Sequence, residues 1–160
     1  MPKRPVGIGI LSIFNLIIGI LVTLTLAILF LIDIQKYLTR SNIWLLMVGI
    51  MFTLSSILLW KKKRWGWWLT SFLFVYTILD TVAFGILENT LEFGYGSIIV
   101  TYVSLTIIYY IFRKNTLEYL EMHEESMANL IESSIMGGIM LEMANYFIST
   151  APSFLVSAYS

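Results

Sequence analysis

Four consecutive cations, residues 61–64, separate two long apolar runs and are flanked by four of the chain's five tryptophans. Charged groups are unfavourable within hydrocarbon, whereas an indole ring settles at the headgroup boundary with its N–H toward water. This stretch therefore predicts a turn at the cytoplasmic surface of a membrane. The turn acts either as a topology determinant alone or as a site for anionic lipid headgroups at the inner face. Its residues are Lys61, Lys62, Lys63 and Arg64, with Trp60, Trp65, Trp67 and Trp68.

The composition places the chain outside the range of soluble domains. Hydrophobic residues make up 58% of its 160 residues and charged residues only 12%, whereas about a quarter of a soluble domain is charged. We therefore predict an integral membrane protein. Cysteine is absent, which excludes disulfides and thiolate metal sites. The formal net charge is zero, but every charged residue after Lys114 is a glutamate, so an acidic tail follows the basic clusters.

Four apolar runs approach or exceed the roughly 20 residues that a helix needs to cross a bilayer. They predict an all-α fold in which residues 1–114 form a polytopic four-helix bundle, with spans at 6–32, 43–60, 65–87 and 96–112. Lysine and arginine accumulate on the cytoplasmic side of such proteins. Four spans place all but Lys36 and Arg40 on one side, so we expect a multi-pass cell-membrane protein with both termini in the cytoplasm. The cations on that side are Lys3, Arg4, Lys61, Lys62, Lys63, Arg64, Arg113 and Lys114.

Small or hydrogen-bonding residues recur at a spacing of four along the predicted spans. Such stripes allow two helix backbones to approach closely and are typical of helix contacts in membranes. We expect helix packing at Gly19, Thr23, Gly49 and Gly85. Faces of this kind also favour association with a second copy of the chain or with other membrane protein subunits.

The tail, residues 115–160, divides into two parts. Its first part is acidic and is expected to be soluble, whereas residues 127–148 have the length of a membrane span. Glu132 and Glu142 lie within this second part, and each would be unfavourable near the centre of a bilayer. We therefore favour an amphipathic cytoplasmic helix whose methionine-rich surface packs on the bundle, on a second copy or on another protein. A fifth span is the alternative.

Asp80 is the only Asp, Glu, Lys, Arg or His residue within the four predicted spans, and such a residue is by default a functional hypothesis. Thr77 and Thr81 share its helix face, and Asn15 is a further intramembrane polar residue of this candidate site. No lysine or arginine is expected at the depth of Asp80, and burial without a counter-charge favours the neutral carboxyl group. Asp80 could then donate a hydrogen bond that locks helix packing, exchange a proton or bind a small cation, or lie in a hydrated outer position.

The sequence offers little support for catalysis. His123 is the single histidine, and it stands among glutamates without a second histidine or any cysteine, so a solvated helix start is favoured over a metal site. No phosphate-binding loop, nucleophile elbow or zinc-binding motif occurs. We expect no catalytic residue, no metal and no cofactor. The four-residue basic stretch is too short to argue for nucleic acid.

Three short patterns carry a resemblance. They are Arg4-Pro5-x-Gly7-Ile8, then Trp60 followed by Arg64-Trp65-Gly66-Trp67-Trp68, and Tyr109-x-x-Phe112-Arg113-Lys114. Over roughly residues 4–114 the chain resembles small four-helix bacterial and archaeal membrane proteins of unknown function. The resemblance implies a four-span architecture and no activity, and the acidic, methionine-rich tail departs from it.

Two hypotheses follow. The first is a non-enzymatic membrane protein that acts through helix association, as a self-assembling bundle or as an accessory subunit of a larger membrane complex. The second is a small proton- or cation-coupled transporter or channel that uses Asp80.

Overall fold

The computed structural model describes residues 5–87, 95–122 and 125–150. This part of the chain is entirely helical, which confirms the predicted all-α class. Lys3, Arg4 and His123 lie outside the described residues, and so do the surroundings of Gly85. The helices are α1 (Val6–Ile32), α2 (Ile34–Tyr37), α3 (Arg40–Trp60), α4 (Arg64–Leu87), α5 (Tyr95–Ile111), α6 (Lys114–Tyr119) and α7 (Met127–Thr150).

Two of the described helices are long and apolar enough to cross a membrane. These are α1, with 27 residues, and α3, with 21 residues; over 18 residues their mean hydropathy reaches 2.7 and 2.2, respectively. The apolar segment Gly96–Ile111 is shorter. Length and composition thus support a membrane association of the chain.

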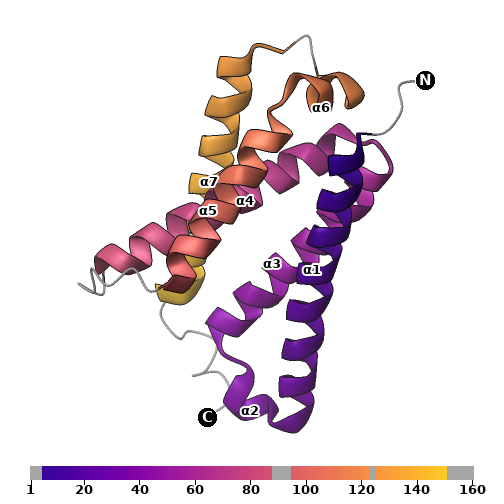
Figure 1. The fold of residues 1–160 in the computed structure, drawn as a ribbon. Coiled ribbons are helices and arrows are strands. Elements are labelled where there is room, and N and C mark those ends of the chain that lie inside the picture. Colours follow the sequence, from indigo (N-terminus) through magenta and orange to yellow (C-terminus); the bar gives the residue numbers. More distant parts are fainter. Residues whose placement is uncertain (1–4, 88–94, 123–124, 151–160) are drawn as a thin grey trace.

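The helices α1 and α3 form an antiparallel pair joined by the short α2 (Figure 1). The pair is close because Gly19 faces Thr53: a Cβ added at Gly19 would lie 2.6 Å from the Thr53 backbone nitrogen. Thr23 and Gly49 belong to the same contact, since a Cβ added at Gly49 would lie 2.9 Å from the Thr23 hydroxyl oxygen. Three of the four predicted packing residues therefore lie between α1 and α3.

The turn between α3 and α4 contains Lys62 in a left-handed backbone conformation, with φ of 56°. The Lys62 N–H donates to the Leu59 carbonyl at 3.0 Å, and the Lys63 N–H donates to the Leu58 carbonyl at 2.9 Å. These two bonds satisfy the last carbonyls of α3 in the pattern of a Schellman motif. The chain reverses within this motif, so α4 begins directly against the end of α3.

The helix α4 joins the pair of α1 and α3 to α5 and α7, because it contacts α3, α5 and α7 (Figure 1). The helix α7 lies along α4 and runs in the same direction, since Ser134 contacts Ser71 near the start of both helices and Asn145 contacts Asp80 farther along. A Cβ added at Gly138 would lie 2.7 Å from the Val75 Cβ. The contact between α4 and α7 thus depends on small residues of α7.

This arrangement excludes one of the three predicted places for the methionine-rich surface of the tail, which is the bundle itself, and leaves a second copy or another protein as predictions. The face of α7 that lies on α4 contains Leu130, Ser134, Gly137 and Gly138, all of them buried. Met136, Met140 and Met143 lie on the opposite side of α7 and are between 53% and 67% exposed. Small side chains permit the closer helix approach, so they form the interface and leave the longer methionines outside.

The acidic part of the tail is also not free in solution. After α5, residues 114–122 fold back over the end of the bundle that carries the basic turn, and Leu117, Leu120 and Met122 are at most 5% exposed. Their apolar side chains complete a core that contains Trp67, Leu59 and Ile111. The prediction considered the glutamates of this stretch and missed the alternating apolar residues, which cover the bundle.

Candidate functional site

The cations of the described chain are divided between the two ends of the structure. The turn between α3 and α4 and the junction of α5 with α6 lie at one end, which we call the basic end, and α2 lies at the other (Figure 1). Lys36 and Arg40 belong to the α2 end. The spatial separation follows the charge asymmetry of the sequence. The basic end contains Lys61, Lys62, Lys63, Arg64, Arg113 and Lys114.

The side chains of the basic turn differ in their surroundings. Lys62 Nζ lies 2.9 Å from Glu121 Oε1 and 5.3 Å from the centre of the Tyr119 ring, so the tail neutralises this cation. Lys61, Lys63 and Arg64 form no ion pair with any residue that the structure describes, and all three are exposed. Three positive charges of the turn are therefore open to an anion.

The four tryptophans of the turn do not share one environment. Trp65 is 73% exposed and Trp60 is 52% exposed, as a membrane-surface residue would be, and Trp68 is partly buried. Trp67 is fully buried, and its indole N–H donates to the Ile111 carbonyl at 2.9 Å. Trp67 thus differs from its predicted place at the headgroups: it joins α4 to the end of α5 within the core.

A line of buried polar side chains passes through the bundle near the basic end. The Asn15 amide donates to Ser55 Oγ at 3.0 Å and to Thr70 Oγ1 at 3.2 Å, which ties α1 to α3 and α4. A hydrogen bond between Ser71 and Ser134 extends the line to α7. Buried hydrogen bonds between membrane helices contribute about 0.6 kcal/mol each. The line therefore connects α1, α3, α4 and α7.

Asp80 lies in a different place, toward the far end of α4. Asn145 of α7 donates to Asp80 Oδ1 at 3.3 Å and also forms a side-chain hydrogen bond with Glu142. Asp80 and Glu142 are close enough for their charges to interact. Glu142 Oε2 is one of the buried oxygens of the described chain without a hydrogen-bond partner. Two carboxyl groups from two helices thus meet around one amide.

The residues predicted to join Asp80 have other roles in the structure. The Thr77 and Thr81 hydroxyls donate to backbone carbonyls of α4 itself, at 2.8 Å and 2.7 Å. Asn15 belongs to the polar line described above. The sequence did contain a signal for the partners that were missed, since Glu142 and Asn145 are spaced to share one face of a helix. From the sequence alone, Glu142 is interpreted only as a charge that is unfavourable near the centre of a bilayer.

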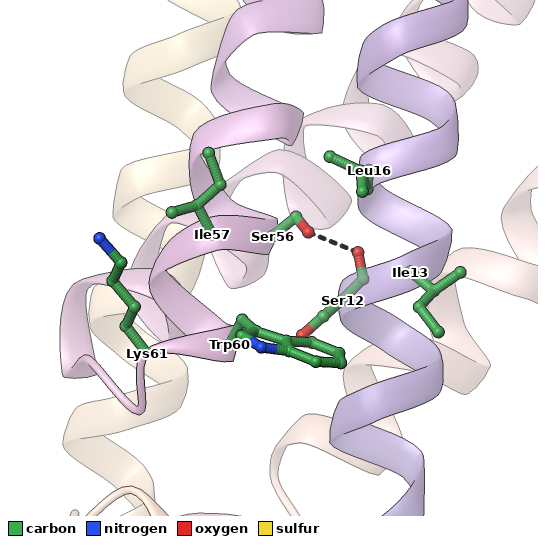
Figure 2. A pocket seen from close by; sticks show the side chains of 7 residues that line it. All are labelled: Ser12, Ile13, Leu16, Ser56, Ile57, Trp60 and Lys61. Atoms are coloured by element: carbon green, nitrogen blue, oxygen red, sulfur yellow. Dashed lines mark hydrogen bonds between the residues drawn. The ribbon is translucent and has the colours of Figure 1, made fainter.

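A shallow apolar groove lies between α1 and α3 beside the basic turn (Figure 2). Its volume is about 290 Å³. The Trp60 ring closes one end of the groove, Leu16 and Ile57 line its two sides, and Lys61 extends outward next to it. The Ser56 hydroxyl in its floor donates to the Ser12 carbonyl at 2.6 Å, so this polar group is already satisfied.

The arrangement offers binding surfaces and one acidic pair. Among the described residues no group of three or more metal-ligating side chains occurs. Comparisons of the chain with protein-family models, with curated proteins and with solved structures gave no match. The functional argument therefore depends on the geometry alone.

Proposed function

We propose that this chain is a non-enzymatic, multi-pass membrane protein that acts through helix association, either with its own copies or as an accessory subunit of a membrane complex. The observation that carries the proposal is the outward face of α7. Met136, Met140 and Met143 are between 53% and 67% exposed on it, next to Tyr146 and Phe147. Methionine adapts to irregular surfaces and is frequent where proteins bind partners.

The use of the polar groups supports the same proposal. The buried hydroxyls of Ser12, Thr70 and Ser134 donate to carbonyls of their own helices, and the Asn15 amide joins three helices. No described set of side chains pairs a nucleophile with a base. What the bundle presents to its surroundings is apolar, which fits contact with lipid or with other helices and not a reaction in water.

We further propose that α7 is a fifth crossing. It lies lengthwise on α4 and runs in the same direction, so a membrane that encloses α4 also encloses α7. Glu142 would then be accommodated by Asn145. In this topology the basic end and the amino terminus are cytoplasmic, and the carboxy terminus lies on the opposite side. A single cysteine introduced after α7 should react with a membrane-impermeant reagent outside intact cells. Labelling that occurs only after lysis would refute the fifth crossing and support a cytoplasmic position of the tail.

The association is tested by the mass of the protein in nanodiscs and by cross-linking in native membranes. Met140→Trp places a large side chain on the outward face of α7 and should reduce the assembled fraction. Leu21→Trp is the matched control, because Leu21 is 60% exposed on α1 and lies outside the α7 face. A strictly monomeric particle without cross-linked partners, in both the parent protein and Met140→Trp, would refute the proposal.

A second candidate function is proton- or cation-coupled transport, favoured by the contact of Asp80 with Asn145 and by the proximity of Glu142 on the same helix as Asn145. Two carboxyl groups near one another in hydrocarbon are typical of ion pathways. In liposomes, Asp80→Asn and Glu142→Gln should each abolish coupled flux, because the amides keep the size of the side chains and cannot exchange the proton. Glu132→Gln is the control, since Glu132 is exposed on α7. Flux that survives both changes would exclude this function.

A further inference from the structure

The groove beside the basic turn has a neighbour farther along the hairpin of α1 and α3. A second hollow follows it on the same face, lined by Ile20, Leu24, Ile50 and Leu54. The two hollows extend along α1 from Ser12 to Leu24, a distance of roughly 18 Å at 1.5 Å per residue. Together they form a long, narrow apolar surface, which we call the hairpin groove.

The hairpin groove offers nothing polar to an occupant along its length. The Thr23 hydroxyl donates to the Gly19 carbonyl at 2.7 Å, and the Thr53 hydroxyl donates to the Gly49 carbonyl at 3.1 Å. Isoleucine and leucine side chains form its walls, with exposed fractions between 41% and 54% at Ile20, Leu24 and Ile50. Its occupant should therefore be an extended hydrocarbon chain.

One end of the hairpin groove has the opposite chemistry. Trp60 closes it, and Lys61 belongs to its lining, with its side chain directed outward (Figure 2). Lys61 has no carboxylate partner among the described residues, whereas the neighbouring Lys62 is paired with Glu121. Lys63 and Arg64 add two further exposed cations in the same turn. An occupant that places hydrocarbon in the groove would bring its other end to a cluster of unpaired positive charges.

We propose that the hairpin groove binds one acyl chain of an anionic glycerophospholipid whose phosphate group lies at Lys61. The length of the groove matches an acyl chain, and the cations complement the headgroup. A second copy is a poorer occupant, because a copy inserted in the same orientation would bring its own basic turn to the same depth. The inference rests on the proposed membrane location and is independent of the assembly through α7.

The proposal is tested by native mass spectrometry of the full chain from nanodiscs that contain equal amounts of phosphatidylglycerol and phosphatidylcholine. The parent protein should retain one phosphatidylglycerol in preference to phosphatidylcholine. Lys61→Gln should reduce the retained fraction about fivefold, because a charge near the headgroups contributes about 1 kcal/mol. Lys36→Gln, at the α2 end of the structure, should leave it unchanged.

A groove-filling variant tests the acyl chain separately from the headgroup. Leu16→Trp should abolish retention of phosphatidylglycerol, and Leu21→Trp, on another part of the α1 surface, should not. Ile57→Trp approaches the same groove from α3 and serves where Leu16→Trp does not fold. Equal retention of the two lipids, or retention unaffected by Lys61→Gln and by both groove-filling changes, overturns the proposal.

The outcomes also separate the lipid site from the other proposals. A chain that inserts in nanodiscs and retains no lipid refutes the lipid site and leaves the membrane location in place. A chain that carbonate releases from membranes refutes the membrane location as well. Loss of a dimer, in place of a lipid, in Leu16→Trp would assign the hairpin groove to a second copy and overturn the lipid site.

Discussion

Gly19→Ala tests the packing of α1 on α3 most directly. The added methyl carbon would lie 2.6 Å from the Thr53 backbone nitrogen and 2.7 Å from the Gly49 carbonyl oxygen. Both neighbours are backbone atoms and cannot rotate away as a flexible side chain can. Carbon atoms pack favourably at about 3.5–4.0 Å, so the two helices would have to separate by about 1 Å.

Gly9 provides the matched control in the same helix, because a Cβ added there meets nothing within 4 Å. Overpacking a core contact lowers the free energy of unfolding by about 1–3 kcal/mol. Replacing glycine by alanine within a helix raises it by up to about 1 kcal/mol, because alanine has the higher helix propensity. Gly9→Ala receives only the favourable effect. Gly19→Ala receives both, so the two variants should differ by about 1–3 kcal/mol in the free energy of unfolding.

The difference can be measured by unfolding the reconstituted protein with increasing fractions of SDS and following helix content by circular dichroism. Gly49→Ala should fall between the two variants, because its added methyl would meet the side chains of Thr23 and Val22 at 2.9 Å and 3.0 Å. If Gly19→Ala unfolds at the same SDS fraction as Gly9→Ala, the close contact of α1 with α3 is not present in the protein.

Three further changes test other contacts. Because the chain has no cysteine, a Ser71→Cys and Ser134→Cys pair should form a disulfide on oxidation, detected by mass spectrometry, whereas a cysteine on the outward face of α7 should not pair with position 71. Trp67→Phe should lower stability to SDS by about 1–3 kcal/mol, since it leaves a buried carbonyl without its donor, while Trp65→Phe, at a site 73% exposed, should be neutral. Lys62→Gly relieves the left-handed φ of 56° and loses an exposed ion pair of at most about 1 kcal/mol, so thermal unfolding should show a change of no more than about 1 kcal/mol.

The limits of the helices could be predicted from the sequence because charged residues mark them. The predicted spans at 6–32, 43–60, 65–87 and 96–112 agree within three residues with α1, α3, α4 and α5. A cation within a long apolar run is unfavourable in a lipid environment, so the ends of the runs are well defined. The crossing of the membrane by these helices stays a prediction.

The neighbours of each helix could not be predicted in the same way. Hydropathy treats Glu142 as an obstacle to burial, whereas in the structure Asn145 and Asp80 lie next to it. The interface of α7 did have a sequence signal, in the small residues Ser134, Gly137 and Gly138 at helical spacing. The methionines are the more conspicuous feature of the sequence, but Met136, Met140 and Met143 lie on the opposite face.

Trp67 shows how periodicity refines a compositional argument. By composition the four tryptophans of the basic turn are equivalent, and each fits the membrane surface. The residues at positions 67, 70, 71 and 74 recur at helical spacing, and all four are buried. The face of α4 that begins at Trp67 is therefore the interior face, and the exposure of Trp65 follows from the same rotation of the helix.

The distribution of buried residues connects the fold with the proposed membrane location. In α1, five of the six buried residues lie between Ile8 and Gly19, and only Leu26 lies beyond them. The core of Trp67, Ile111 and Met122 is at the basic end as well. The basic end thus has its own packing, whereas the far half of α1 contacts little of the chain besides α3. Over 18 residues the mean hydropathy of α1 reaches 2.7, and exposed apolar surface is unfavourable in water, so a lipid covering of that half fits the proposed membrane location.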